Sequence, residues 1–501
     1  MEIAGTTDLK RESYRSILKS TSLVGGASVL NILIGMVRVK FVAILLGPAG
    51  VGLLGMYNQV IALITTATGM GVGNSGVRQV AEAVGSNDDL RISRTVITLR
   101  RTAWLTGGLG MLVMIGLCVP ISRVTFGTTD HAVPIAFLGV TVLLTAITAG
   151  QACLLRGTRR IADIARITVI GALSGTLISI PCFYLWGIQG IVLSLIMSAT
   201  AALVTSWWYA RRVFIRPLVM SWSESWLETR ALLYLGISFM GAALVTNATS
   251  YMIQAILVRQ FSLAGAGIYQ AAYSLSGVLV GFVLAAMSAD YYPRLTAVAG
   301  DYPSVHRMVN EQSQVSILLA LPGLAAMMIF SPLIIQLFYS ASFVTAVPIL
   351  RWCILGVLGR VISWPLGFVV LAQGKGTLYF VTEAFACGLQ VVCVIFFTSV
   401  WGLEGAGIAF MTLYVIYTGM MLDVVRRLIG HTWTFSTLKL SSFAVAVIIL
   451  LLVNSTFNCN QIVAWTINIV ILAIVSLICF KQLVSKLGIR LPELFARGTR
   501  E

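Results

Sequence analysis

Cationic side chains lie inside several long apolar stretches of this sequence, where charge is costly. Glu383 is the one acidic residue well inside such a stretch, against five basic residues. An arginine at the centre of a bilayer costs about 2.5–3.5 kcal/mol, so such side chains persist where they contact protein, water or a ligand. The excess of cations predicts a site for an anion, and phosphate is an anion that guanidinium groups bind well. The five basic residues are Arg38, Lys40, Arg259, Arg351 and Arg360.

The elements that must position these residues are membrane-spanning helices. The 501 residues are 58% hydrophobic and 10% charged, with a mean hydropathy of +0.93. A soluble chain of this length carries about 25% charged residues. Apolar runs of 18 or more residues recur throughout and predict an all-α integral membrane protein of about fourteen spans. The predicted spans are 18–46, 49–77, 100–122, 132–155, 164–186, 190–211, 231–258, 265–289, 313–339, 344–373, 378–400, 404–423, 438–455 and 462–480.

Lys and Arg are distributed unequally between the two sets of connections. One set, which includes both termini, holds 28 of the 34 Lys and Arg residues, whereas the opposite set holds essentially Arg123 alone. The positive-inside rule places the basic set, and therefore both termini, in the cytoplasm. This rule also accounts for most of the net charge of +16, so no nucleic-acid partner is expected.

The two halves of the chain resemble one another at a nearly constant offset. Residues 49–52 match 264–267, and residues 186–190 match 401–405, both at an offset of 215. Each repeat contains six spans, so the copies share one orientation, and we expect two six-helix bundles related by a pseudo-two-fold axis, with two peripheral C-terminal helices. The predicted domains are a cytoplasmic N-terminal segment (1–17), an N-terminal bundle (18–211), a cytoplasmic linker with an interfacial helix (212–230), a C-terminal bundle (231–424), two extra transmembrane helices (425–480) and a cytoplasmic tail (481–501).

The repeat also brings polar residues to matching positions. Asn31 lies seven residues before Arg38, on the same helical face, and Asn247 matches Asn31 in the second half. A polar stripe at matching places in two bundles is typical of a shared cavity, and Arg38 and Arg360 are the strongest candidates to line it. For Lys40 and Arg259 the alternative is that the side chain reaches the membrane surface. The predicted substrate-binding residues are Arg38, Arg360, Asn31, Asn247, Arg78, Lys40, Arg351 and Arg259.

Two acidic residues are candidates for coupling to an ion. Glu383 either neutralises Arg360 across a helical hairpin or titrates, and the first interpretation is favoured. Asp290 lies four residues before Arg294, a spacing that favours an ion pair on one helix. No catalytic centre is expected.

The sequence contains no convincing nucleotide or metal motif. Residues 71–76 satisfy GxGxxG, but they end an apolar helix instead of following a strand, so they indicate close helix packing or a flexible cytoplasmic gate. The GxxxxGK[ST] pattern of ATP-binding loops does not occur, and the three histidines and eight cysteines do not form a metal-binding pattern. We therefore expect no cofactor and no metal.

A family resemblance is carried by three short segments: residues 47–53 (Gly-Pro-Ala-Gly-Val-Gly-Leu), Asn58-Gln59 and residues 76–81 (Gly-Val-Arg-Gln-Val-Ala). These segments resemble the Wzx-type O-antigen and common-antigen flippases of the multidrug/oligosaccharidyl-lipid/polysaccharide exporter superfamily. The resemblance is most specific over residues 15–85. It implies a secondary transporter of the bacterial inner membrane that moves undecaprenyl-diphosphate-linked oligosaccharide units, such as those of lipopolysaccharide, from the cytoplasmic to the periplasmic leaflet by alternating access.

The resemblance also implies a cationic lumen and a proton gradient, a sodium gradient or the membrane potential as the driving force. The implied partners are the lipid-linked oligosaccharide, membrane lipids, a polysaccharide polymerase and a chain-length regulator.

Three alternatives stay open at this point. A flippase for the peptidoglycan lipid precursor would have the same fold. A multidrug antiporter that exports cations would be expected to carry more acidic residues in its cavity than Glu383. A polymerase or oligosaccharide transferase would need a large periplasmic catalytic loop, and the short connections on that side argue against it.

Overall fold

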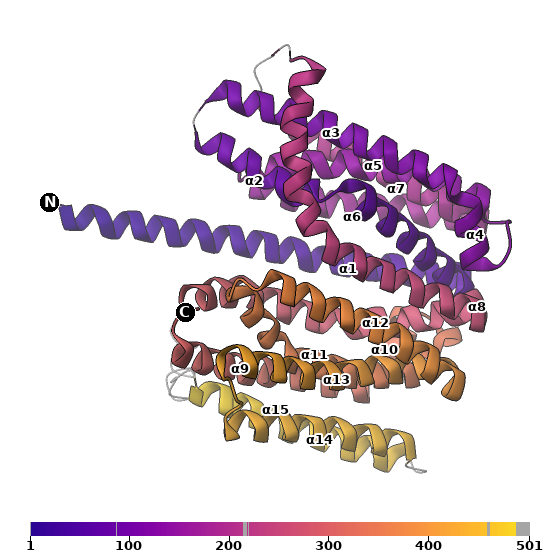
Figure 1. Ribbon diagram of the computed structural model, residues 1–501. Coiled ribbons are helices and arrows are strands. Elements are labelled where there is room, and N and C mark those ends of the chain that lie inside the picture. Colours follow the sequence, from indigo (N-terminus) through magenta and orange to yellow (C-terminus); the bar gives the residue numbers. More distant parts are fainter. Residues whose placement is uncertain (1, 87, 214–217, 219, 458–460, 487–501) are drawn as a thin grey trace, which may run out of the picture. The chain divides into compact units, whose positions relative to one another are not determined.

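The computed structural model describes residues 2–86, 88–213, 218, 220–457 and 461–486, which are helical almost throughout and contain no strand (Figure 1). This confirms the predicted all-α class. Contacts divide the chain into two compact units at Ala264 and Gly265.

The first unit contains seven whole helices and the first part of an eighth. Helix α3 packs along α5, α6 packs along α7, and α1 packs against α6. The small residues Gly107 and Gly139 allow α3 and α5 to approach closely, because an added methyl group at either would lie about 3.0–3.1 Å from the neighbouring helix. The helices are α1 (Glu2–Gly69), α2 (Val72–Gly85), α3 (Asp89–Gly116), α4 (Cys118–Phe126), α5 (Ala132–Gly157), α6 (Ile161–Trp186), α7 (Gly190–Ala210) and α8 (Trp222–Ala297).

The second unit contains the rest of α8 and seven further helices. A buried core of aliphatic side chains joins the end of α8 to α9, α11 and α13; it includes Leu295, Val309, Leu366 and Val425. The helices are α9 (Tyr302–Ile329), α10 (Ser331–Phe338), α11 (Ala346–Ala372), α12 (Gly376–Trp401), α13 (Gly405–Ile429), α14 (Phe435–Phe457) and α15 (Gln461–Lys486).

The internal repeat is visible in the backbone. α1 bends at Gly47 (φ 64°, ψ −167°), and α8 bends at Ser262 (φ 66°, ψ 175°), 215 residues later. Short 3₁₀ turns η1 (Gly187–Gln189) and η3 (Gly402–Glu404) join α6 to α7 and α12 to α13 at the same offset. An added methyl group at Gly190 would lie 2.2 Å from the Cys182 carbonyl oxygen, and one at Gly405 would lie 2.1 Å from that of Phe397, so both hairpins need glycine.

Nine described helical stretches are long and apolar enough to cross a membrane, or ten when α3 and α4 are counted as one bent span. Several of these stretches contain two passes; Ile161–Ala210, for example, has 50 residues and contains a sharp turn at Gly187. When the described helices are divided at Gly47, Ser262 and the 3₁₀ turns, fourteen long segments match the predicted spans in number and order. The chain is therefore a multi-pass membrane protein.

Some predicted boundaries are wrong. The second span was predicted to reach residue 77, but α1 ends at Gly69 because Met70 and Gly71 have positive φ, and α2 is a separate helix. The ninth predicted span contains a break at Phe330, between α9 and α10. α8 begins at Trp222 and runs on into the seventh span. An interfacial position for its first turns, like the predicted domain limits, stays a prediction.

The break between α1 and α2 packs against α8. An added methyl group at Gly71 would lie 2.0 Å from the Gly236 carbonyl oxygen, and one at Gly236 would lie 2.1 Å from that of Met70. The two backbones therefore touch, and neither position accepts a side chain without a shift of a helix. Close helix packing, predicted from the glycine-rich stretch 71–76, is confirmed at this point.

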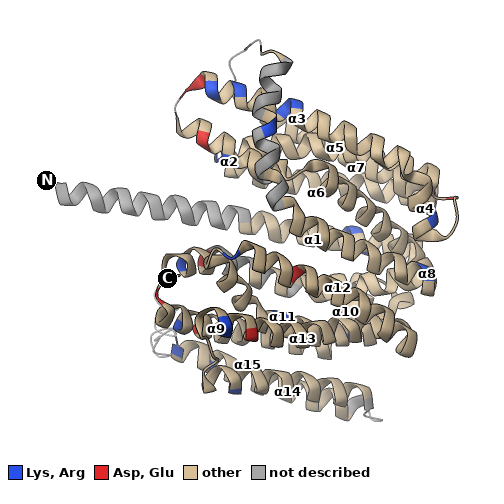
Figure 2. Cartoon of the chain, viewed as in Figure 1, with Lys and Arg blue, Asp and Glu red and all other residues tan. Residues whose placement is uncertain are grey.

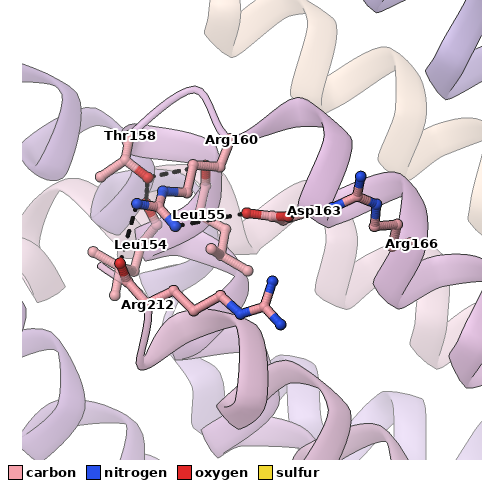
Figure 3. Close-up of polar contacts among 7 residues, drawn as sticks. All are labelled: Leu154, Leu155, Thr158, Arg160, Asp163, Arg166 and Arg212. Carbon is pink, nitrogen blue, oxygen red and sulfur yellow. Dashed lines mark hydrogen bonds and ion pairs between the residues drawn. The ribbon is translucent and has the colours of Figure 1, made fainter. Parts of the chain in front are cut away.

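Charged residues lie mostly near helix ends, and the middles of the helices carry few of them (Figure 2). One cluster joins the α5–α6 turn to the end of α7 (Figure 3). Asp163 lies 3.7 Å from Arg160 and 3.4 Å from Arg166, and Arg160 also donates to the Arg212 carbonyl oxygen at 3.1 Å. These contacts join the α5–α6 connection to the segment that follows α7, and the charge distribution predicts that both are cytoplasmic.

The two extra helices, α14 and α15, pack on α9. Asn310 of α9 accepts hydrogen bonds from Thr434 and from Thr437 at the start of α14. Lys486 at the end of α15 donates to Gln314, also on α9. Polar contacts thus hold this helical hairpin to the second unit at one end.

Candidate functional site

Arg38 lies in the first unit, at the junction of three helices. Its Nε atom is buried and has no hydrogen-bond partner in the described part of the chain. A methyl group placed on Gly175 of α6 would lie 3.8 Å from an Nη atom of Arg38 and 3.7 Å from the hydroxyl oxygen of Ser198 on α7. The Ser198 hydroxyl is buried and unpartnered among the described residues as well. Two polar groups without hydrogen-bond partners therefore flank one glycine, and buried polar groups of this kind can bind the polar atoms of a ligand.

The other candidates of the first unit lie in different surroundings. Asn31 is exposed on α1 and Lys40 is half-buried. Asn247 of α8 donates to the Thr66 hydroxyl of α1 at 2.8 Å. Gln254, seven residues further along α8, is buried and its Nε2 has no partner among the described residues. Asn247 is therefore held by another helix. The Nε2 group of Gln254 has no such partner among the described residues and could donate a hydrogen bond to a ligand.

Arg259 and Arg351 make structural contacts. Arg259 donates to the carbonyl oxygens of Val124, at 2.8 Å, and Arg123, at the end of α4. Arg351 donates from Nε to the Ser331 hydroxyl and from an Nη to the Ser455 carbonyl oxygen, both at 3.2 Å. Each guanidinium group therefore stabilises the end of another helix.

Arg78 and Asp290 each form an exposed ion pair within one helical turn. Arg78 lies 2.8 Å from Glu82, and Arg294 lies 2.9 Å from Asp290, as its spacing predicts. Exposed pairs of this kind contribute about 0.3–0.5 kcal/mol. The roles of Arg78 in substrate binding and of Asp290 in ion coupling stay predictions.

Arg360 lies in the second unit among aromatic side chains. Its guanidinium carbon is 5.5 Å from the centre of the Trp364 ring, a cation–π contact. Its charge also acts on the nearby phenols of Tyr273 and Tyr414. No ion pair joins Arg360 to an acidic residue in the described segments. The charge is thus stabilised by rings and stays available to an anion.

The expected pairing of Glu383 with Arg360 is wrong. Glu383 of α12 instead accepts a hydrogen bond from the Tyr417 hydroxyl of α13 at 2.6 Å. Tyr417 also packs on Tyr414, with ring centres 6.1 Å apart. The acid and the cation thus have separate partners, because a phenol on the next helix is better placed than the guanidinium group.

Sequence reasoning missed a polar cluster near the α4–α5 connection. The Tyr57 hydroxyl and His131 Nδ1 are 3.0 Å apart and share a hydrogen bond, and Phe126 stacks on the His131 ring. Burial lowers the pKa of His131 below its usual value, and the nearby charge of Asp130 opposes that effect. Tyr57 and Tyr273 lie 216 residues apart, close to the offset of the repeat, and this match was the signal available in the sequence.

A family model described as "Polysaccharide biosynthesis protein" matches residues 17–298, more than half of the chain. The chain belongs to this family. The Lipid III flippases of Escherichia coli and Shigella flexneri are each 24% identical to it over 426 residues, which cover 82% of this chain and 98% of theirs.

Solved structures share the fold. A multidrug resistance MATE family transporter of the MOP superfamily, in an inward-facing conformation, has a TM-score of 0.69 at 15% identity and covers 80% of this chain and 94% of its own. The Lipid II flippase MurJ, in an inward closed conformation, has a TM-score of 0.66 at 14% identity and covers 93% and 99%. These likenesses show that the chain has the fold shared by these two proteins, as the resemblance in its sequence predicted.

Proposed function

We propose that this chain is a flippase that moves undecaprenyl-diphosphate-linked oligosaccharide units of O-antigen or a related surface polysaccharide from the cytoplasmic to the periplasmic leaflet. The family match and the Lipid III flippase relatives support a lipid-linked cargo. The proposed location is the bacterial inner membrane, with both termini in the cytoplasm, because the connections that include the termini hold most of the Lys and Arg residues.

The observation that carries this proposal is the Arg38 guanidinium group, whose buried Nε atom has no hydrogen-bond partner among the described residues and which lies beside Gly175 and Ser198. A cation of this kind is expensive to keep in a membrane protein unless a ligand offsets the cost. A diphosphate offers two adjacent anionic groups and several acceptor oxygens, which match the donors of a guanidinium group. Ser198 can add a hydroxyl donor to the same oxygens.

Arg360 supplies the corresponding cation of the second unit. Its aromatic neighbours leave the guanidinium donors available, and Glu383 is held by Tyr417. Each of the two arginines binds the diphosphate at some stage of an alternating-access cycle, while the polyprenyl tail stays in the lipid. The membrane potential or a proton or sodium gradient resets the protein, and a polymerase and a chain-length regulator use the delivered unit.

A cation antiporter is the less favoured alternative. Such a protein needs an acidic side chain that is free to bind its cargo, and the carboxylate of Glu383 already accepts a hydrogen bond. Arg38 and Arg360 are cations, and their charge favours an anionic cargo over a cationic one. A peptidoglycan precursor flippase would use the same diphosphate chemistry, so the experiment must separate the two lipids.

The test is deletion of the gene, followed by analysis of the lipid-linked saccharides and of the leaflet in which they lie. We expect a surface-polysaccharide intermediate to accumulate in the cytoplasmic leaflet, and accumulation of the peptidoglycan precursor would favour the alternative. Complementation with Arg38→Ala or Arg360→Ala should fail at normal protein levels. Arg427→Ala is the matched control, because Arg427 is 80% exposed and pairs with Asp423 at the end of α13. Normal surface polysaccharide from both test variants would reject the assigned roles.

A further inference from the structure

A cavity of about 410 Å³ opens on the surface of the first unit between α3, α5 and α7. Its volume lies in the range of small-molecule sites, about 300–1,000 Å³. Gly150 forms part of its wall, and an added methyl group there would lie 2.8 Å from the Ala103 side chain, so α3 and α5 are in close contact beside it. The cavity is separate from the surroundings of Arg38, because Arg38, Gly175 and Ser198 are not among the described residues that line it.

Among the described residues that line this cavity, Arg100 is the one that carries a charge. It makes no ion pair or hydrogen bond with the described residues. The next residue, Arg101, instead donates to the carbonyl oxygens of Met220, at 2.9 Å, and Ser221, at 3.1 Å, in the connection before α8. Successive side chains on a helix point about 100° apart. Arg101 therefore binds the connection before α8, whereas Arg100 points toward the cavity.

Two tryptophans flank the cavity. Trp104 and Trp207 are 59% and 52% exposed, as is typical of rings at the boundary between lipid and water. Arg211, one turn beyond Trp207, lies over the rings of Trp207 and Trp208, at 5.2 and 3.6 Å. A second guanidinium group is therefore held close to the same wall. The remaining wall contains one amide, Gln151, which accepts a hydrogen bond from the Ser206 hydroxyl, and is otherwise apolar, with Leu203 and Val204.

We propose that this cavity binds an anionic phospholipid of the surrounding bilayer. The phosphate contacts Arg100, and the upper part of one acyl chain lies against Ala103, Leu203 and Val204. Basic pockets between helices on the cytoplasmic side are the kind of site that binds anionic head groups, and the charge distribution places the start of α3 on that side. The cavity is too small for a whole lipid, so the rest of the acyl chains remains in the bilayer.

The experiment is native mass spectrometry of the purified full-length chain with phosphatidylglycerol or phosphatidylethanolamine added. The unaltered protein should retain more phosphatidylglycerol than phosphatidylethanolamine. Arg100→Gln should weaken that binding about tenfold, as expected for loss of a charge-assisted contact, and Arg100→Lys should restore part of it. Arg94→Gln is the matched control, because Arg94 lies exposed on the same helix outside the cavity.

Val204→Trp fills the cavity and leaves Arg100 in place, so it should abolish retention of both lipids. An equal loss in Arg100→Gln and Arg94→Gln would indicate a general charge effect and overturn the proposal. Unchanged binding in Arg100→Gln, or undiminished retention by Val204→Trp, would also overturn it. Competition by undecaprenyl diphosphate that displaces phosphatidylglycerol would assign the cavity to the cargo and not to bilayer lipid.

Discussion

Replacing Arg38 by methionine should abolish transport without lowering stability. Methionine fills a similar volume, and no hydrogen bond from Arg38 Nε is lost, because that atom has no partner among the described residues. The change removes a cation whose insertion costs about 2.5–3.5 kcal/mol at a helix centre. Because Arg38 is only partly buried, we expect a smaller gain, about 1 kcal/mol, and a Tm that is unchanged or raised by about 2 °C.

Arg351→Met is the matched comparison. Arg351 loses two hydrogen bonds, to Ser331 and to the Ser455 carbonyl oxygen. Bonds to a charged group contribute about 1.5–3 kcal/mol each when well buried. For this half-exposed side chain we expect a total loss of about 2–3 kcal/mol and a fall in Tm of about 5 °C.

The assay is thermal unfolding of both purified variants in the same detergent, with complementation of a deletion strain measured in parallel. A Tm for Arg38→Met that falls as far as that of Arg351→Met would refute the reasoning, because it would show that Arg38 is held by structural contacts.

Three further outcomes are expected. Ser262→Gly should raise the Tm by a few degrees, because serine occupies a conformation that suits glycine, as at Gly47; a lower Tm would contradict this. Burial and a neighbouring imidazole lower the pKa of His431 to about 4, so the unfolded chain binds the proton first and acid favours unfolding. Stability should therefore fall by about 2 kcal/mol between pH 7 and pH 4.5, as measured from unfolding curves at the two pH values. If a His431→Phe variant loses the same stability over this range, His431 is not the cause. Glu383→Gln should retain transport within about twofold in a complementation assay, since an amide oxygen still accepts from Tyr417; a loss above tenfold would instead indicate that the carboxyl group titrates.

The sequence predicted the helices and their repetition well, because both depend on local features. Apolar length defines a span, and the glycine-rich matches at residues 186–190 and 401–405 correspond to the turns η1 and η3. The glycine at position 47 and the serine at position 262 show the limit of this reasoning. The same bend occurs at both places, but only the first has the residue type that predicts it.

The partners of the charged residues could not be predicted in the same way. Arg38 and Arg351 are alike in the sequence, as arginines within apolar runs, yet one guanidinium group keeps an unpartnered nitrogen and the other joins α10 to α14. The difference depends on contacts between helices that are distant in the chain. Glu383 was paired with the wrong residue for the same reason, because the position of Tyr417 depends on how α13 packs beside α12.

The most direct test of the central claim is equilibrium binding of undecaprenyl diphosphate and of uncharged undecaprenol to the purified chain. The unaltered protein should bind the diphosphate at least tenfold more tightly than the alcohol, and Arg38→Gln should remove most of that preference. Equal binding of the two lipids by the unaltered chain, or an undiminished preference in Arg38→Gln, would contradict the assignment of Arg38 to the diphosphate.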